Sequence, residues 1–291
     1  MFMKKRILPV LIILMTLIHT GCDATQQEKP AEQQAAEYFA QGTKETDPIK
    51  KRALYEKAAV MGNAEAQVTL GVLHSIGRGV EQDYAKAKEW FEKAAVQENA
   101  KAQSSLGFLY YSAEGAEQNY AKAREWFEKA AAQGDAAAQT FLGIMYTIGE
   151  GVRQDYVKAK EWYEKAAAQG NASAQSGLGD MYHHGAGVRQ DYAKARLWYE
   201  KAAAQGDATA QYNLGIMYHK SRGVGQDDTR ARLWFEKAAS QGHANAQFLL
   251  GYIYYNGYGV RQDYLVAKEW FGRACDNGDQ PGCDAYKQLN R

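Results

Sequence analysis

The tryptophans of this chain are evenly spaced, and that spacing constrains the fold more than any other feature. Each lies 36 residues after the one before, at Trp90, Trp126, Trp162, Trp198, Trp234 and Trp270. A fixed period of this length, kept from about residue 48 to the end, indicates stacked supersecondary units that complete one another's apolar cores. The sequence therefore predicts an extended repeat protein and favours a binding surface over a catalytic pocket.

Each unit contains two helical patterns. In the first, Tyr84, Ala87 and Trp90 lie on one stripe of an amphipathic helix, and Asp83 stands where an N-cap is needed. The second follows Asn99 and reads Ala-x-Ala-Gln-x-x-Leu-Gly-x-x-Tyr. No strand-like alternation interrupts them, so we expect an all-α fold. Six full units span 48–83, 84–119, 120–155, 156–191, 192–227 and 228–263, and a shortened seventh spans 264–291.

Two glycines recur in every full unit for different reasons. Gly71 stands inside the second helix, where glycine costs about 1 kcal/mol relative to alanine. We infer that its missing Cβ lets the first helix approach closely. Gly79 lies beyond the helix, where a left-handed residue turns the chain. The pair Gly77-x-Gly79 is weak evidence for a phosphate-binding loop, because no strand precedes it.

These motifs resemble the Sel-one-like repeat family, a relative of the tetratricopeptide repeat. The resemblance rests on Tyr-Ala-Lys-Ala-Lys-Glu-Trp-Phe-Glu-Lys-Ala-Ala at 84–95, on residues 100–110 and on the Gly-x-Gly-Val loops, and it covers 244 of 291 residues. It implies a right-handed α-solenoid whose members act as adaptors or scaffolds for other proteins. The sequence departs from the family pattern at Asp228, Ala113, Ser221 and Cys283.

The N-terminal segment differs from the repeats. Lys4, Lys5 and Arg6 precede an apolar run over 7–18 that has the length of a signal-peptide core. The following residues resemble a bacterial lipoprotein box, which implies a signal peptide over 1–21 and a lipid on Cys22. Ordinary secretion with Cys22 as a spare thiol is the alternative. We expect a polar tether over 22–33 and a capping helix over 34–47, and the sequence leaves open whether the membrane is the inner or the outer one.

The two remaining cysteines, Cys275 and Cys283, lie between the two helices of the last unit. Their placement fits an exported protein. A cysteine-rich branch of the same family ties its helices together at this spacing, so the resemblance implies a Cys275–Cys283 disulfide, with packed free thiols as the alternative.

Charge and motifs restrict the function. The 35 basic and 34 acidic residues give a net charge of +1, which provides no electrostatic footprint for nucleic acid. The sequence has no Ser-x-x-Lys, Gly-x-Ser-x-Gly, His-Glu-x-x-His or Walker motif. We therefore expect no cofactor and a non-catalytic scaffold or adaptor, anchored in the bacterial cell envelope and facing the periplasm, that binds envelope proteins or peptides. An envelope hydrolase acting on β-lactam or cell-wall substrates and a stoichiometric regulator or inhibitor of an envelope enzyme are the alternatives.

Three histidines, His183, His184 and His219, gather at the ends of the second helix in neighbouring units. Equivalent points on stacked units lie ~10 Å apart by helix-packing distances, whereas zinc-bound nitrogens lie about 2 Å from the metal. Surface histidines are the better interpretation, and we expect no metal site.

A partner-binding patch is the sharper hypothesis. Leu197 and Leu233 replace glutamate or alanine at one outward position of the Trp-bearing helix, and Arg196 and Arg232 lie beside them. In tetratricopeptide-like folds we expect this side of the helix to line the concave face, so these four residues would form an apolar strip edged with cations. The alternative is that the leucines fill space between successive helices.

Overall fold

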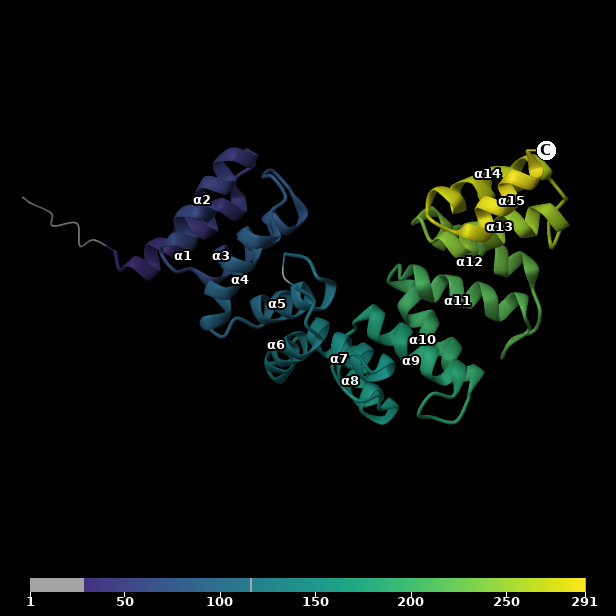
Figure 1. Cartoon of the computed structure of the whole chain (residues 1–291), viewed down its shortest axis with the longest axis horizontal. Helices are drawn as coiled ribbons and strands as arrows, with labels where there is room; N and C mark the ends of the chain where they lie inside the picture. The colour runs from purple at the N-terminus through teal and green to yellow at the C-terminus, as the bar shows by residue number, and fades with distance from the viewer. Residues whose placement is uncertain (1–28, 116, 291) are drawn as a thin grey trace, which may run out of the picture.

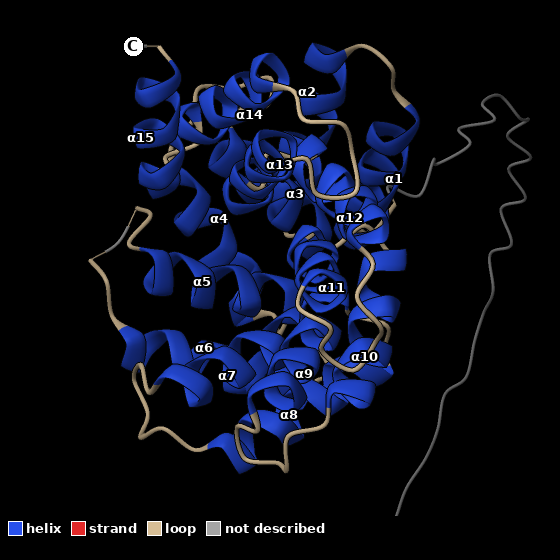
Figure 2. Ribbon diagram, turned by 90° about the vertical axis from the view of Figure 1, so that its right-hand side faces the viewer, coloured by secondary structure: helices blue, strands red, loops and turns tan. Residues whose placement is uncertain are grey.

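The computed structural model describes residues 29–115 and 117–290, and the predicted signal peptide and Cys22 lie outside them. Within this part of the chain all regular structure is helical, and the helices follow one another along an open arch (Figures 1 and 2). The helices are α1 (Ala31–Lys44), α2 (Pro48–Val60), α3 (Ala64–Ile76), α4 (Tyr84–Val96), α5 (Ala100–Ser112), α6 (Tyr120–Ala132), α7 (Ala136–Ile148), α8 (Tyr156–Ala168), α9 (Ala172–His184), α10 (Tyr192–Ala204), α11 (Ala208–His219), α12 (Asp228–Ser240), α13 (Ala244–Asn256), α14 (Tyr264–Asp276) and α15 (Gln280–Leu289). The predicted all-α solenoid is confirmed.

The helices pair in a different phase from the units drawn on the sequence. Each odd-numbered helix from α3 to α13 contacts the following even-numbered helix most extensively, across the loop that carries the second glycine. The contact between an even-numbered helix and its successor is smaller. One structural repeat is therefore an odd-numbered helix followed by a Trp-bearing helix, beginning with α3–α4.

The glycine inside each odd-numbered helix permits this close pairing. A Cβ built on Gly71 would lie 2.5 Å from the ring of Phe91, and the equivalent glycines of the other repeats meet a Phe or Tyr ring in the same way. Because no side-chain atom can occupy that space, the aromatic ring of the second helix rests directly on the backbone of the first. The close approach inferred from the sequence is confirmed.

The same contact shows what α1 does. A Cβ on Gly42 would lie 2.6 Å from the ring of Tyr55 in α2, and Gly42 is buried. The helix expected over 34–47 spans Ala31–Lys44, so it begins inside the stretch expected to be a tether. Helices α1 and α2 thus pair as a repeat does, although only three residues connect them.

The loop that links the paired helices has a left-handed residue at the C-cap of the first helix or one residue later. The C-cap residue is glycine after four of these helices, for example Gly149 at φ 85°, and Gly79 adopts φ 72° two residues after another C-cap. Ala113 and Ser221 replace the first loop glycine and still adopt positive φ, at 63° and 55°. The loop geometry is therefore kept where the glycine is lost, with backbone strain at those two positions.

The tryptophans join neighbouring repeats. Trp162 is half-buried and packs on a cluster that contains Phe127 of the preceding repeat and Leu142 of its own. Lys165 Nζ lies 4.0 Å from the centre of its ring system. The tryptophans of the other repeats are also half-buried. The fully buried aromatic residue of each Trp-bearing helix is the Phe or Tyr that follows the tryptophan.

The odd-numbered helices lie on the inner side of the arch. Helices α5, α7 and α9 each contact the next odd-numbered helix directly, whereas successive Trp-bearing helices make fewer contacts with one another. Because elements on the inner side of a curve are closer together, the odd-numbered helices line the concave side. The expectation that the Trp-bearing helices line it is therefore wrong. No helix of residues 29–115 and 117–290 is both long and apolar enough to cross a bilayer.

Candidate protein-binding surface

Each odd-numbered helix of the six repeats exposes one stripe of side chains. In α3 the stripe consists of Glu65, Thr69, Val72 and Ile76, whose spacings of four, three and four place them on one side of the helix. The residues at the equivalent positions, 36 apart along the chain, are all partly or fully exposed. We call these positions the inner stripe.

The residues of the inner stripe change from repeat to repeat. Its first position reads Glu65, Lys101, Ala137, Ser173, Thr209 and Asn245, and its second reads Thr69, Ser105, Phe141, Gly177, Asn213 and Leu249. By contrast, the buried positions of Ala66, Gln67, Leu70 and Gly71 hold the same residue types in all six repeats. Packing therefore fixes the buried side of the helix and leaves the inner stripe free to specify a partner.

The inner stripe forms an apolar groove near the N-terminal end of the arch. A hollow of about 480 Å³ is lined by residues of three successive odd-numbered helices, among them Val72, Ile76, Phe108 and Phe141. The rings of Phe108 and Phe141 meet edge to face with their centres 5.7 Å apart. Exposed apolar surface shared by three helices is typical of a site that binds another protein.

The inner stripe becomes polar in the middle of the arch. Asp180 of α9 takes the place that Val72 has in α3, and its Oδ1 accepts hydrogen bonds from the Tyr199 hydroxyl at 2.6 Å and from Asn213 Nδ2 at 3.0 Å. Burial raises the pKa of the Asp180 carboxyl. Toward the C-terminal end, Tyr252 and Tyr258 lie with their ring centres 5.7 Å apart. The concave face thus offers apolar, polar and aromatic segments in succession.

Two of the three histidines singled out in the sequence have polar partners within the protein, and His183 is buried and not on the surface as expected. Buried His183 accepts from Arg222 at 2.9 Å through Nε2, and His219 Nδ1 lies 2.7 Å from Asp228 Oδ1. Burial is the main reason that the pKa of His183 falls to about 4. Among the described residues no three potential ligands come together in a geometry that could hold a metal ion.

The candidate patch on the Trp-bearing helices lies on the convex side. Leu197 and Leu233 expose 53% and 47% of their surface, so neither is buried between helices. Arg196 Nε lies 3.8 Å from Glu200, and Arg232 forms an ion pair with Glu236. The two cations are therefore balanced by carboxylates on their own helices.

The last hairpin is closed by a disulfide. Cys275 in α14 and Cys283 in α15 are bonded to each other, and their Cα atoms are 4.4 Å apart. The bond ties α15, which covers the C-terminal end of the arch, to the last Trp-bearing helix.

The comparison with known families identifies the repeats. The family model described as Sel1 repeat matches residues 64–98, 100–135, 136–171, 172–207, 208–243 and 244–279. The chain belongs to the Sel1 repeat family. Each matched segment begins at the first residue of an odd-numbered helix, so the family model has the same phase as the helix pairs in the structure. Membership of this family supports a role in protein–protein interaction.

Solved structures with the same fold include a protective antigen of uropathogenic Escherichia coli, c5321, and a Sel1 repeat protein from Oxalobacter formigenes. The first is 38% identical with a TM-score of 0.67 and covers 89% of this chain, which spans only 56% of that protein. The second is 32% identical with a TM-score of 0.72, and the match covers 81% of this chain and 96% of the other. The Pseudomonas aeruginosa immunity protein PA5088, 21% identical with a TM-score of 0.55 over 75% of this chain and 82% of its own, shares the fold. No curated protein matches the chain.

Proposed function

We propose that this Sel1 repeat protein is a non-catalytic scaffold of the bacterial cell envelope that binds a segment of another protein along its inner stripe. The observation that carries the proposal is the contrast between a constant buried framework and an exposed concave stripe that differs in every repeat. If the side chains of the inner stripe served only to stack one repeat on the next, they would be as uniform along the chain as Ala66 and Gln67 are.

The apolar groove is where we propose that the partner is anchored. Ile76 and Phe108 expose 58% and 38% of their surface there, and Phe141 stacks on the buried ring of Phe127 with centres 4.9 Å apart. This rigid backing suits an apolar side chain of the partner, because a pre-formed pocket lowers the entropy cost of binding.

The envelope location rests on three supports. The N-terminal sequence resembles a lipoprotein signal that ends at Cys22. The Cys275–Cys283 disulfide is typical of proteins in oxidising compartments. The relative from uropathogenic E. coli is described as a protective antigen, which is compatible with this location. We propose attachment through lipid on Cys22, with the repeats facing the periplasm or the cell exterior.

Site-specific photocrosslinking in cells that express the full-length chain tests the binding surface. A photoreactive residue at position 108 should capture one discrete protein, and Ile76→Glu in the same chain should abolish the capture. The matched control places the photoreactive residue at position 197 on the convex side, where we expect no such product. Capture at position 197 alone, or capture at 108 that is insensitive to Ile76→Glu, would contradict the proposal.

The membrane attachment has its own test. Wild-type protein should fractionate with membranes and incorporate a labelled fatty acid, and Cys22→Ala should do neither. If Cys22→Ala remained in the membrane fraction, the anchor would not be the proposed lipid, and the binding test would be unaffected.

A further inference from the structure

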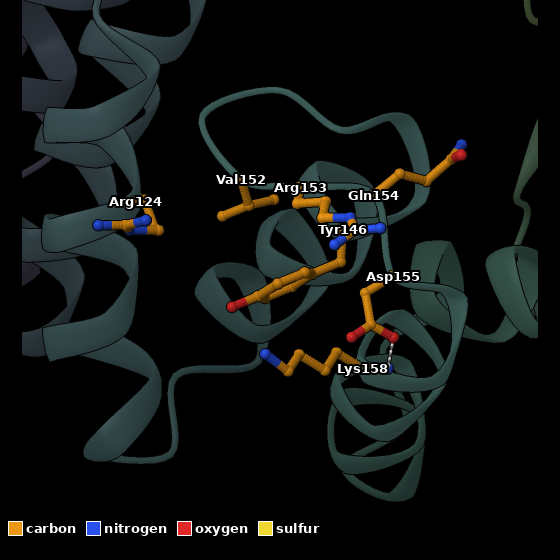
Figure 3. A pocket seen from close by; sticks show the side chains of 7 residues that line it. All are labelled: Arg124, Tyr146, Val152, Arg153, Gln154, Asp155 and Lys158. Atoms are coloured by element: carbon orange, nitrogen blue, oxygen red, sulfur yellow. Dashed lines mark hydrogen bonds between the residues drawn. The ribbon is translucent and has the colours of Figure 1, made fainter.

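Two adjacent repeats carry a basic hollow at their loop edge, away from the inner stripe. The first is lined by Arg124 of α6, Tyr146 of α7, the loop over 152–155 and Lys158 of α8, and has a volume of about 510 Å³. Figure 3 shows the hydroxyl of Tyr146 and Nζ of Lys158 pointing to the same side, toward Arg124. Lys158 Nζ lies 5.3 Å from the centre of the Tyr146 ring, so the ring holds the ammonium group at the wall of the hollow.

The next repeat builds the same hollow. Tyr182, Arg189 and Lys194 take the places of Tyr146, Arg153 and Lys158, and this hollow has a volume of about 610 Å³. Lys194 Nζ lies 5.4 Å from the centre of the Tyr182 ring. Lys160 stands at the sequence position equivalent to Arg124, but it does not line this hollow and its Nζ lies 2.6 Å from Glu164.

The full set of three cations is confined to these two repeats. Where they have Arg153 and Arg189, the other repeats have Glu81, Glu117, Gly225 and Arg261. The repeat with Arg261 has Val266 in place of the lysine. The paired hollows are therefore a local feature and not a consequence of the repeat pattern.

Carboxylates of the protein balance only part of this charge. In the first hollow the one lining carboxylate is Asp155, which accepts from the backbone N–H groups of Val157 and Lys158 as a helix cap. Arg124 Nε lies 3.6 Å from Glu128, whereas no ion pair within the described residues involves Arg153, Lys158 or Arg189. Three cations, one of them paired, and Tyr146 thus line the first hollow. In the second hollow Lys194 Nζ lies 3.7 Å from Asp191, so Arg189 is the lining cation without an ion pair.

We propose that the paired hollows bind two carboxylates of an extended acidic segment of a protein partner. Adjacent repeats are ~10 Å apart by helix-packing distances. A segment in the extended polyproline II conformation covers about this distance in three residues, and every third side chain then lies on the same side. A segment with acidic residues three positions apart would place one carboxylate in each hollow, where a guanidinium, an ammonium and a phenol group can donate hydrogen bonds to it.

The surroundings favour a peptide over a phosphate surface. The net charge of the chain is +1, and exposed Glu125 and Glu161 lie on the same two Trp-bearing helices as Arg124 and Lys160. A membrane of anionic lipids or a nucleic acid would meet these carboxylates too, whereas a peptide with two discrete acidic side chains would not. This site is separate from the inner stripe, so it can fail while the proposed function stands.

The test uses the purified chain and fluorescent peptides. One peptide carries two glutamates separated by two serines, and its control carries glutamines in their place. The double variant Arg153→Glu/Arg189→Glu introduces the residue that the first two repeats already have there, so it should fold. We expect it to weaken binding of the glutamate peptide by about tenfold or more, and we expect the glutamine peptide not to bind.

Arg261→Glu is the matched control, because it makes the same change at the same position in a repeat without the lysine, and it should leave the affinity unchanged. Equal weakening by Arg261→Glu would overturn the proposal, since it would show a general charge effect. Failure of the glutamate peptide to bind, equal binding of both peptides, or binding of inorganic phosphate or phosphatidylglycerol vesicles alone would also overturn it.

Discussion

The side-chain amide of Gln169 donates a hydrogen bond to Oε1 of Gln139 at 2.9 Å, and buried Gln139 in turn donates to the carbonyl of Ala131 at 3.3 Å. Gln139 therefore links both helices of its own repeat to the Trp-bearing helix of the repeat before. The side-chain contact recurs in all six repeats, in five as Gln to Gln and in the last as Asn277 to Gln247. The bond to an alanine carbonyl of the preceding Trp-bearing helix, or of α2, recurs from Gln67, Gln211 and Gln247. A buried polar side chain thus helps to specify how these repeats stack on the helix before them.

Replacing this glutamine should destabilise the arch. Gln139→Leu removes both hydrogen bonds of a buried side chain, so we expect a loss of about 1–3 kcal/mol in the free energy of unfolding, although the Ala131 carbonyl still accepts from the backbone N–H of Gly134 at 3.0 Å. Gln169→Ala removes an exposed partner and should cost less, about 0.5–1.5 kcal/mol. Urea denaturation followed by circular dichroism measures both, and an equal or larger loss for Gln169→Ala would contradict the assignment.

At the glycine beneath each aromatic ring, substitution by alanine should change stability in the opposite direction to the one that helix propensity alone predicts. Alanine favours a helix by about 1 kcal/mol over glycine, but a Cβ on Gly143 would lie 2.6 Å from the ring of Tyr163. We expect Gly143→Ala to destabilise the protein by about 1–3 kcal/mol, because the buried ring must move. Gly225→Ala is the control, since no atom lies within 4 Å of its Cβ position. A stabilised Gly143→Ala protein in thermal melts would show that the ring yields freely.

A buried phenylalanine and a half-buried tryptophan on successive Trp-bearing helices should differ in their contribution to stability. Phe127 is fully buried between Gly107 of α5 and the stacked ring of Phe141 in α7, whereas Trp162 is half-buried against the cluster that contains Phe127. We expect Phe127→Ala to cost about 3–5 kcal/mol and Trp162→Ala about 2–3 kcal/mol, because less of its surface leaves water. Chemical denaturation of the two variants ranks them. A greater loss for Trp162→Ala would contradict the ranking of the two residues by burial.

The sequence predicts this fold well because each feature that determines the structure recurs in several repeats. The spacing of the tryptophans, the caps such as Asp83 and the glycine at Gly71 each recur, so the helices and their close contact follow from them. The phase of the repeat does not follow, because a periodic pattern has no intrinsic starting point. The choice between α3–α4 and α4–α5 as the tighter pair depends on the Gly71–Phe91 contact, which is a fact of packing.

The binding surface is harder to predict for the same reason. Sequence analysis selected Leu197 and Leu233 as departures from a uniform pattern, and the structure places them on the convex side. The inner stripe has no uniform pattern from which to depart. Its signal is the variation itself, which can be seen when positions such as Val72, Phe108 and Asp180 are compared across repeats. That variation gains meaning only once the helix that lines the concave side is known.

Burial of His183 predicts a specific dependence of stability on pH. Its pKa is lowered to about 4, chiefly by burial and also by the neighbouring charges of His184, Arg222 and Lys220. The unfolded histidine titrates near 6.5, so below that pH the unfolded chain binds a proton that the folded protein does not. His183 should therefore contribute full stability above about pH 6.5 and progressively less as the pH falls toward 4. His183→Thr, which introduces the residue found at the equivalent Thr147, should lose less stability over this range than the wild type in urea titrations at successive pH values. Parallel losses in the two proteins would show that His183 takes up a proton in the folded state as easily as in the unfolded one.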